Sequence, residues 1–298
     1  MRTIRYEIDP AHDGMQVGGF LRGKGYSRAL LTMLKNEDGL ALNGAHIRTV
    51  DTIKSGDIIT VTLKDVSGAV PNASLNAYIT YDDDDVVVFD KPPGMPVHTS
   101  HGHNDDTLEN LFAALYPEQG FHAVSRLDKN TSGLIAAAKN KYAASRLMSD
   151  ERCRPHKVYY AVTAIDAVEK IGESGEITAP IARESDSVIK RTVRDDGEYA
   201  RTVFKAVKKN DKYCLYEIIL ATGRTHQIRV HFSYRGCPLI GDDLYGGDTS
   251  VLRRQALHCG SLLFVQPVTG EKISLNSELP SDISALFDNE CTKYGFIT

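Results

Sequence analysis

The spacing of hydrophobic residues predicts that the chain begins with a small unit that contains one helix, one hairpin and one strand. Leu30, Leu31 and Leu34 recur at helical spacing, and Ser27 stands before them as an N-cap. After a glycine turn, the segment IITVTL alternates apolar and polar residues as a strand does. The helix therefore comes before the strand along the chain.

An Asn-Gly pair at positions 43 and 44 lies between apolar residues, which is a strong signal for a two-residue hairpin. Helix, hairpin, turn at Gly56 and strand in this order resemble the small S4-like RNA-binding fold, with an unrelated α+β domain as the alternative. We assign residues 1–66 to an S4-like RNA-binding domain. Residues 67–77 contain Gly, Pro, Asn and Ser with weak periodicity, so we assign them to a linker.

From residue 78 to residue 298 the pattern becomes rich in strands, with a few helical segments. An apolar strand ends at Asp90, and the segment HKVYYAVTAI alternates so that Lys157 and Tyr159 share one face. Strands outnumber helices and do not strictly alternate with them. We therefore expect an α+β fold with a mixed, largely antiparallel central sheet flanked by helices. One helical stripe is expected from Leu108, Leu111, Phe112 and Leu115.

Composition places the chain among ordinary globular proteins, with 42% hydrophobic and 25% charged residues in a length of 298. The net charge of −4 gives no global attraction to nucleic acid, so any site for a polyanion has to be a local patch. The N-terminus lacks the apolar core of a secretory signal, and no apolar run approaches the ~20 residues of a membrane-spanning helix. We therefore expect a cytoplasmic protein without a membrane partner.

Cysteines and histidines give little sign of a metal site. Five cysteines lie far apart, and their odd number favours free thiols in a reducing compartment over disulfides or zinc ligands. His98, His101 and His103 form a loose group among Thr, Ser and Gly. A flexible loop explains this group better than a metal site does.

The segment VSRLDKNTSGL, residues 124–134, places charged residues inside an otherwise apolar stretch. In an extended chain Arg126 and Asp128 lie on one face, while Leu127 points to the other and can anchor the segment in the core. The following Asn-Thr-Ser-Gly turn can then fix the position of Asp128 through hydrogen bonds to the backbone. Taken alone, a surface ion pair between Arg126 and Asp128 is the simpler interpretation.

A second polar segment, ATGRTHQIRVHF, follows an expected strand and begins an expected helix. Two Arg, two His and one Gln within eight residues are unusually polar for a core helix. The glycine-rich turn GDDLYGG comes soon afterwards, and several polar turns in one chain indicate the rim of a site. Tyr159 can add a ring that stacks on a planar base, although packing within a strand is the simpler explanation of one tyrosine.

These segments occur in the order found in the RluA-like family of RNA pseudouridine synthases: VVVFDKPPGMPVH, SRLDKNTSGL, HKVYYAV, and TGRTHQIRVHF with GDDLYGG. Together they make the resemblance specific, and it covers roughly residues 75–275. It implies that residues 78–298 form the catalytic domain of an isomerase that converts uridines of structured RNA to pseudouridine, without a cofactor or a metal. The expected substrate is large-subunit ribosomal RNA, with transfer RNA as the alternative, and a monomer is the default.

Carried over residue by residue, the resemblance assigns Asp128 as the catalytic aspartate and Tyr159 as the tyrosine that stacks on the target base. It assigns Arg229 as the arginine that pairs with the aspartate, and Arg224 is the alternative for this role. Such an arginine would keep the carboxylate ionised in a pocket that excludes water. The family's usual histidine before the Arg-Leu-Asp motif is replaced by Ser125. Residues expected to bind the substrate RNA are Arg126, Thr131, Lys157, Arg224, His226 and Gln227.

Two interpretations from other functional classes stay open. A degenerate synthase would retain only RNA binding, although Asp128, Tyr159 and Arg229 are all present. A glycosidase-like hydrolase would need a second carboxylate beside Asp128. Asp242 and Asp243 are candidates for that carboxylate, but a glycine-rich turn explains the pair more simply.

Overall fold

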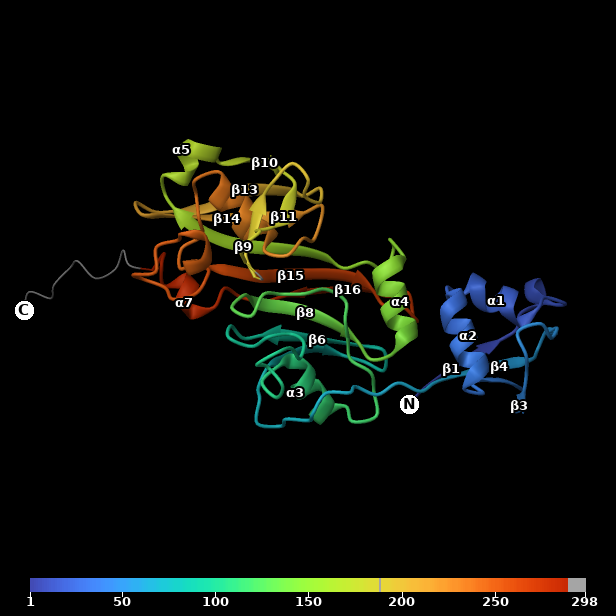
Figure 1. The fold of residues 1–298 in the computed structure, drawn as a ribbon. Helices are drawn as coiled ribbons and strands as arrows, with labels where there is room; N and C mark the ends of the chain where they lie inside the picture. The colour runs from blue at the N-terminus through green and yellow to red at the C-terminus, as the bar shows by residue number, and fades with distance from the viewer. Residues whose placement is uncertain (188, 289–298) are drawn as a thin grey trace, which may run out of the picture.

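Two β-sheets with separate hydrophobic cores organise the chain (Figure 1). The structure is a computed structural model that describes residues 1–187 and 189–288. The smaller unit, blue in Figure 1, lies at one end of the molecule and has the strand order β1-β4-β2-β3. Its elements are β1 (Arg2–Glu7), η1 (Pro10–His12), α1 (Val17–Gly23), α2 (Arg28–Asn36), β2 (Leu40–Leu42), β3 (Ala45–His46) and β4 (Ile58–Leu63).

The expected helix and hairpin of this unit form as the sequence predicts. The Ser27 hydroxyl accepts a hydrogen bond from the Leu30 amide at 3.2 Å and thereby caps α2. Asn43 and Gly44 have φ values of 49° and 85°, the positive pair that a tight hairpin needs. Residues 64–77, all of them described, form no helix or strand. The S4-like identity of the unit and the three proposed domain boundaries stay predictions.

The larger unit is built on a ten-stranded sheet in which neighbouring strands are antiparallel except for β15 with β8. This arrangement confirms the expected mixed, largely antiparallel sheet. β6 ends at Lys91, one residue later than predicted. The strands are β5 (Tyr78–Asp82), β6 (Val86–Lys91), β7 (His122–Ala123), β8 (Ser132–Ala138), β9 (His156–Ala164), β10 (Ser174–Thr178), β13 (Arg201–Lys209), β14 (Tyr213–Leu220), β15 (Leu257–Val265) and β16 (Lys272–Asn276). A separate ribbon pairs β11 (Ile181–Arg183) with β12 (Arg191–Val193).

Short helices accompany this sheet, and no helix in the described ranges is long and apolar enough to cross a membrane. The predicted apolar stripe on α3 is one residue too long. Leu108, Leu111 and Phe112 are buried, but Leu115, the last residue of the helix, is 46% exposed. α6 packs against β12 and β13. The helices are α3 (Leu108–Leu115), α4 (Lys141–Ser149), α5 (Ala167–Ile171), α6 (Gln227–Tyr234), η2 (Asp243–Tyr245) and α7 (Ser281–Ser284).

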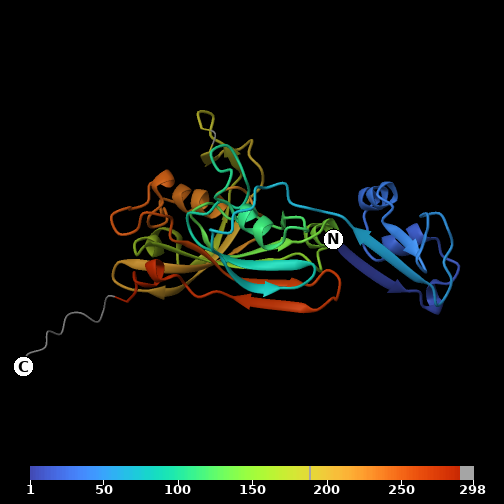
Figure 2. The ribbon, with the colours of Figure 1, turned by 90° about the horizontal axis from the view of Figure 1, so that it is seen from below.

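The smaller unit is attached to the larger one beside α4, as Figures 1 and 2 both show. Tyr26 stacks on Tyr142 of α4 with ring centroids 4.3 Å apart. The Tyr142 hydroxyl also donates to the Lys24 carbonyl at 2.7 Å. Arg2 donates to both oxygens of buried Asp85 at 2.9 Å, and bidentate pairs of this kind are the stronger ones. Stacking and a charge-assisted pair therefore hold the two units together.

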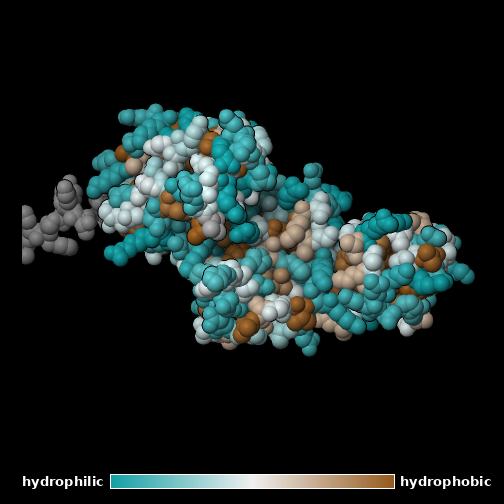
Figure 3. All heavy atoms as spheres, viewed as in Figure 1, coloured by the Kyte–Doolittle hydropathy of each residue, from teal (hydrophilic) through white to brown (hydrophobic). Residues whose placement is uncertain are grey.

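The face of the molecule drawn in Figure 3 is mostly hydrophilic. Hydrophobic residues on this face gather in a hollow between the lobe that carries α5 and β10 and the lobe that carries α3. In Figure 1 the central strands β15 and β8 pass behind this hollow.

Strand register aligns one row of residues across the centre of the sheet. Lys91 of β6 pairs with Gly133 of β8, Gly133 with Cys259 of β15, and Cys259 with Tyr159 of β9. Gly133 has a φ of 107°, and a Cβ there would lie 2.2 Å from the Cys259 carbonyl oxygen. Glycine is therefore required for β8 to approach β15. Since paired residues share a face of a sheet, Lys91 and Tyr159 project on the same side.

Replacing Gly133 with alanine should destabilise the larger unit, because the added Cβ meets the backbone of β15. We expect the free energy of unfolding to fall by more than about 2 kcal/mol. Urea denaturation followed by circular dichroism measures this loss, since the chain has no tryptophan. Gly270→Ala is the control, because Gly270 has a φ of 77° with open space around it and should cost only about 1 kcal/mol. Equal losses would contradict the close approach of the strands.

Candidate active site

Asp128 lies on the loop between β7 and β8, and this loop is held on both sides of the aspartate. Leu127 is 7% exposed and packs in the core of the larger unit, as the alternation predicts. The Thr131 amide donates to the Asp128 carbonyl at 3.0 Å and closes a turn. The Asp128 side chain remains 24% exposed. Its carboxylate can therefore contact both the protein and a substrate.

Arg229 links Asp128 to a second, buried carboxylate. Its Nη1 donates to Asp128 Oδ2 at 3.1 Å, while its Nε and Nη2 donate to Asp242 at 2.7 and 2.8 Å. Burial acts to lower the pKa of Arg229, but the hydrogen bonds and charge of Asp242, with those of Asp128, outweigh it and raise that pKa. The guanidinium therefore stays charged and is held in one orientation.

A histidine and a tyrosine complete the surroundings of Asp128. His226 precedes α6 with a φ of 58°, and its Nε2 lies 3.8 Å from Asp128 Oδ1. Its Nδ1 lies 2.9 Å from the hydroxyl of Tyr245, and the Arg229 guanidinium lies 5.0 Å from the centroid of the same tyrosine ring. Burial lowers the pKa of His226, although the charge of Asp128 acts in the opposite direction. The imidazole is therefore neutral at pH 7.

Lys91 ties the Asp128 loop to the sheet. The side chain is completely buried, and Nζ donates to the carbonyls of Pro92, Met95 and Lys129 at 2.8, 2.9 and 3.0 Å. Three acceptors match the three N–H donors of a charged lysine. Burial lowers the pKa of Lys91 to about 7, and the charge of Asp128 acts against this shift. In the sequence, nothing except its place in the DKPPG segment marks this lysine.

Tyr159 projects from the row of residues that begins with Lys91. It is 5% exposed, and the ammonium of Lys157 lies 5.8 Å from the centroid of its ring. Burial raises the pKa of Tyr159 well above its usual value, and the negative charge of Asp128 acts in the same direction. The hydroxyl therefore keeps its proton at neutral pH. Tyr159 of β9 therefore lies close enough to Asp128, on the loop before β8, to feel its charge.

Two arginines that the sequence placed near Asp128 do not pair with it. Arg126 is exposed, and no ion pair joins it to Asp128 within the described residues, so the simpler interpretation of this loop as a surface ion pair is wrong. Arg224 pairs with Glu198 at 3.0 Å instead. The position beside Asp128 is occupied by Arg229, so Arg224 does not fill this alternative role in this structure.

Two expected RNA contacts are buried inside the protein. Thr131 is 1% exposed, and its hydroxyl accepts a hydrogen bond from Gln255 at 3.1 Å. Gln227 is 2% exposed, and its amide donates to the Arg201 carbonyl and to the Thr202 hydroxyl at 3.0 Å each. These side chains hold the Asp128 turn and the start of α6, which corrects the expectation that they face the substrate. Their polarity is visible in the sequence, but their burial is not.

The turn in the GDDLYGG segment also provides the buried carboxylate that binds Arg229, which the sequence does not indicate. Gly241 and Gly246 have φ values of 76° and 84° and form the expected turn. Asp242 is nevertheless fully buried and binds Arg229, whereas the neighbouring Asp243 is exposed. The turn therefore positions a carboxylate under the arginine.

The histidine-rich loop is held by carboxylates. His98 lies 3.3 Å from Glu109, and His103 lies 2.7 Å from Asp106. Among the described residues no group of three or more His, Cys, Asp or Glu side chains could hold a metal ion. Four of the five cysteines are buried free thiols, and Cys291 lies outside the described residues.

Comparison with known protein families shows which family the chain belongs to. Residues 85–234, half of the 298 residues, match the family described as RNA pseudouridylate synthase. The chain belongs to this family. It is therefore an RNA pseudouridine synthase, an isomerase that modifies RNA, as the order of its motifs implied. The matched range contains Asp128, Tyr159 and Arg229.

Individual relatives resemble the chain over most of its length. The protein named uncharacterized RNA pseudouridine synthase YjbO of Bacillus subtilis is 37% identical over 273 residues, covering 89% of this chain and 96% of its own. The ribosomal large subunit pseudouridine synthase D of Xanthomonas campestris is 36% identical, covering 88% and 84%. The solved structure of human RNA Pseudouridylate Synthase Domain Containing 1 matches with a TM-score of 0.56 at 25% identity, over 70% of this chain and 85% of that one.

Asp242→Asn should weaken both the fold and the reaction, because it leaves the buried guanidinium of Arg229 with less compensating charge. We expect the free energy of unfolding to fall by about 3 kcal/mol. We also expect a turnover rate at saturating RNA that is about 10²-fold lower, since Arg229 loses its orientation. Chemical denaturation and pseudouridine formation measure the two effects.

Asp243→Asn is the matched control for this change. Asp243 is the exposed neighbour in the same turn, so its replacement should leave both the stability and the rate close to those of the wild type. If the two variants behaved alike, Asp242 would have no special role in holding Arg229.

Proposed function

We propose that the chain isomerises uridines of large-subunit ribosomal RNA and that Asp128 is its catalytic carboxylate. Relatives from Xanthomonas campestris and Pseudomonas aeruginosa, 36% and 34% identical over 88% and 86% of this chain, are named ribosomal large subunit pseudouridine synthase D. These names support the ribosomal target. One observation carries the role of Asp128: Arg229 is held between this partly exposed carboxylate and the buried Asp242.

The charges of the reaction suit an ionised carboxylate at this position. Breaking the glycosidic bond of uridine leaves positive charge at C1′ and negative charge on the departing uracil. A carboxylate can stabilise that positive charge, bond to C1′ or remove a ribose proton. Arg229 places its positive charge beside Asp128 by donating to Oδ2, and its Nε and Nη2 donate to Asp242. Oδ1 of Asp128 therefore remains available to the nucleotide.

Tyr159 is proposed to hold the detached uracil by stacking. A stack restrains the plane of the base but lets it rotate within that plane, which is the motion that brings C5 to C1′. Because the hydroxyl keeps its proton at neutral pH, the ring acts as a surface rather than as a phenolate base. The ring is only 5% exposed, so a base reaches it after a neighbouring side chain moves. Lys157 is the neighbour that lies over the ring.

The target uridine has to leave its helix or loop to reach Asp128, at a cost of a few kcal/mol. Exposed arginines and lysines near the site can offset this cost through phosphate contacts. Arg126 and Lys129 flank Asp128 on its loop, and both are exposed. The net charge of −4 makes such contacts local, which suits recognition of a structured RNA.

Release of tritium from RNA that carries 5-³H-uridine tests the role of Asp128, because the new bond at C5 expels that hydrogen into water. Asp128→Asn should lower the rate of release by about 10³-fold or more while leaving the fold intact. Asp243→Asn provides an exposed carboxylate in the same region as the control. Release by Asp128→Asn at the wild-type rate would overturn the assignment.

The same assay tests the substrate when ribosomal and transfer RNA are supplied separately. We expect release from large-subunit ribosomal RNA and none above background from transfer RNA. Release from transfer RNA alone would contradict the proposed target but keep the chemistry. Binding without release from either RNA would contradict both.

Two substitutions at Tyr159 separate its ring from its hydroxyl. Tyr159→Phe should keep most of the activity, because phenylalanine retains the stacking surface. Tyr159→Leu should lower kcat/KM by about 5- to 150-fold, equivalent to the ~1–3 kcal/mol of one base stack. Thermal melting of each variant checks that the core remains folded. Equal losses in the two variants would show that the hydroxyl, not the ring, is required.

A further inference from the structure

The ribbon of β11 and β12 brings two arginines face to face. Arg183 at the end of β11 is the register partner of Arg191 at the start of β12. Like charges directly opposite on paired strands repel each other. Arg183 is exposed, and its side chain forms no hydrogen bond or ion pair with the described part of the chain. The Arg191 guanidinium donates through Nη1 to the carbonyls of Ile189 and Lys190 at 3.0 and 3.2 Å, which hold it in place on the ribbon.

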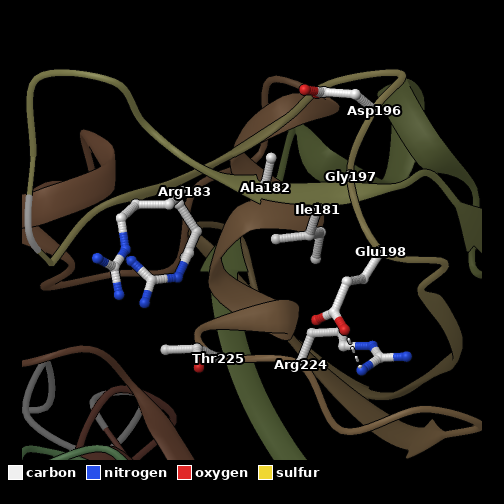
Figure 4. Close-up of a pocket in the computed structure, with 9 residues that line it drawn as sticks. Ile181, Ala182, Arg183, Asp196, Gly197, Glu198, Arg224 and Thr225 are labelled. Carbon is white, nitrogen blue, oxygen red and sulfur yellow. Dashed lines mark hydrogen bonds and ion pairs between the residues drawn. The ribbon is translucent and has the colours of Figure 1, made fainter.

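A hollow of about 300 Å³ lies against these arginines. Figure 4 shows Arg183 extending from the ribbon toward the loop that carries Thr225, while Arg224 turns toward Glu198. The two carboxylates at its edge have partners of their own, since Asp196 pairs with Arg194 and Glu198 with Arg224. The hollow is lined by, among others, Arg183, Arg191, Asp196, Glu198, Arg224 and Thr225.

Hydrogen bonds connect this ribbon to the surroundings of Asp128. The Arg191 amide donates to the Tyr245 hydroxyl at 2.9 Å, and the same hydroxyl lies 2.9 Å from His226 Nδ1. His226 in turn lies beside Asp128, with its Nε2 3.8 Å from the carboxylate. These contacts place the ribbon close to the proposed catalytic group.

We propose that the hollow binds a backbone phosphate of the RNA strand next to the target uridine, an inference that rests on the proposed function. The guanidinium of Arg183 offers a planar fork of donors that fits phosphate oxygens. A phosphate beside the ribbon is attracted by the positive charges of both Arg183 and Arg191. The hydrogen bonds through Tyr245 and His226 then relate the position of that phosphate to Asp128. The site fixes the register of the strand without reading its sequence.

Arg183→Ala tests the proposal, with Arg235→Ala as the matched control. Arg235 is exposed at the end of α6 and does not line the hollow. The dissociation constant of a large-subunit ribosomal RNA transcript is measured by filter binding at several salt concentrations. We expect Arg183→Ala to bind about tenfold more weakly at about 50 mM salt and about threefold more weakly at about 200 mM. The slope of log K against log salt should be shallower by about 0.7–0.9, the contribution of one phosphate contact.

Melting temperature separates this role from a structural one. In the absence of RNA, Arg183→Ala should melt at or above the wild-type temperature, because it removes one of two opposed charges. Arg183→Lys keeps the charge without the fork and should retain most of the salt slope. A lower melting temperature, or a salt slope equal to that of Arg235→Ala, would overturn the phosphate site.

Tritium release by the wild type keeps the two proposals distinguishable. If the wild type releases tritium and Arg183→Ala has the same KM as Arg235→Ala, the phosphate site is wrong and the proposed function stands. If the wild type releases none, the proposed function fails, and the salt slopes still decide whether the hollow binds phosphate. The expected result is release by the wild type and a KM that rises more than kcat falls in Arg183→Ala.

Discussion

The guanidinium of Arg229 is shared between two carboxylates of different exposure, and the geometry around Asp128 depends on this sharing. Asp242 is fully buried and binds two N–H groups of the arginine, whereas Asp128 is partly exposed and binds one. A buried charge without partners would be very costly, so Asp242 and Arg229 fix each other. Asp128 then meets a positive charge whose position does not depend on substrate.

The sheet supplies the second constraint. Gly133 lets β8 lie against β15, and the row from Lys91 to Tyr159 crosses the sheet at that level. The loop with Asp128 enters β8 just before Gly133 and is tied down by the buried ammonium of Lys91. A proposed stacking surface and a proposed catalytic carboxylate are therefore placed by backbone pairing. The chemistry of the site is built on rigid elements and not on mobile loops alone.

Local patterns in the sequence predicted much of the fold. The cap at Ser27, the Asn43-Gly44 hairpin and the alternation of β9 are confirmed because each depends on neighbours within a few residues. The anchoring of Leu127 in the core is confirmed for the same reason. The mixed sheet follows from the excess of strands, but its strand order depends on contacts between distant segments. No local pattern contains that order.

The site was predicted less completely than the fold, because burial and side-chain direction are tertiary properties. The resemblance indicates Arg229 as the arginine that meets Asp128, which the structure confirms, but in the sequence a glycine-rich turn explains its buried partner Asp242 more simply. The sequence indicates Thr131 and Gln227 as RNA contacts, but the structure encloses both side chains inside the protein.

A double-mutant cycle between Asp242 and Arg229 tests the central claim most directly. Tritium release at saturating RNA is measured for the wild type, Asp242→Asn, Arg229→Gln and the double variant. If Asp242 acts only by holding Arg229, the double variant should be no slower than Arg229→Gln alone. If the two losses in rate multiply instead, the two residues act independently, and the shared guanidinium is not what prepares Asp128 for the reaction.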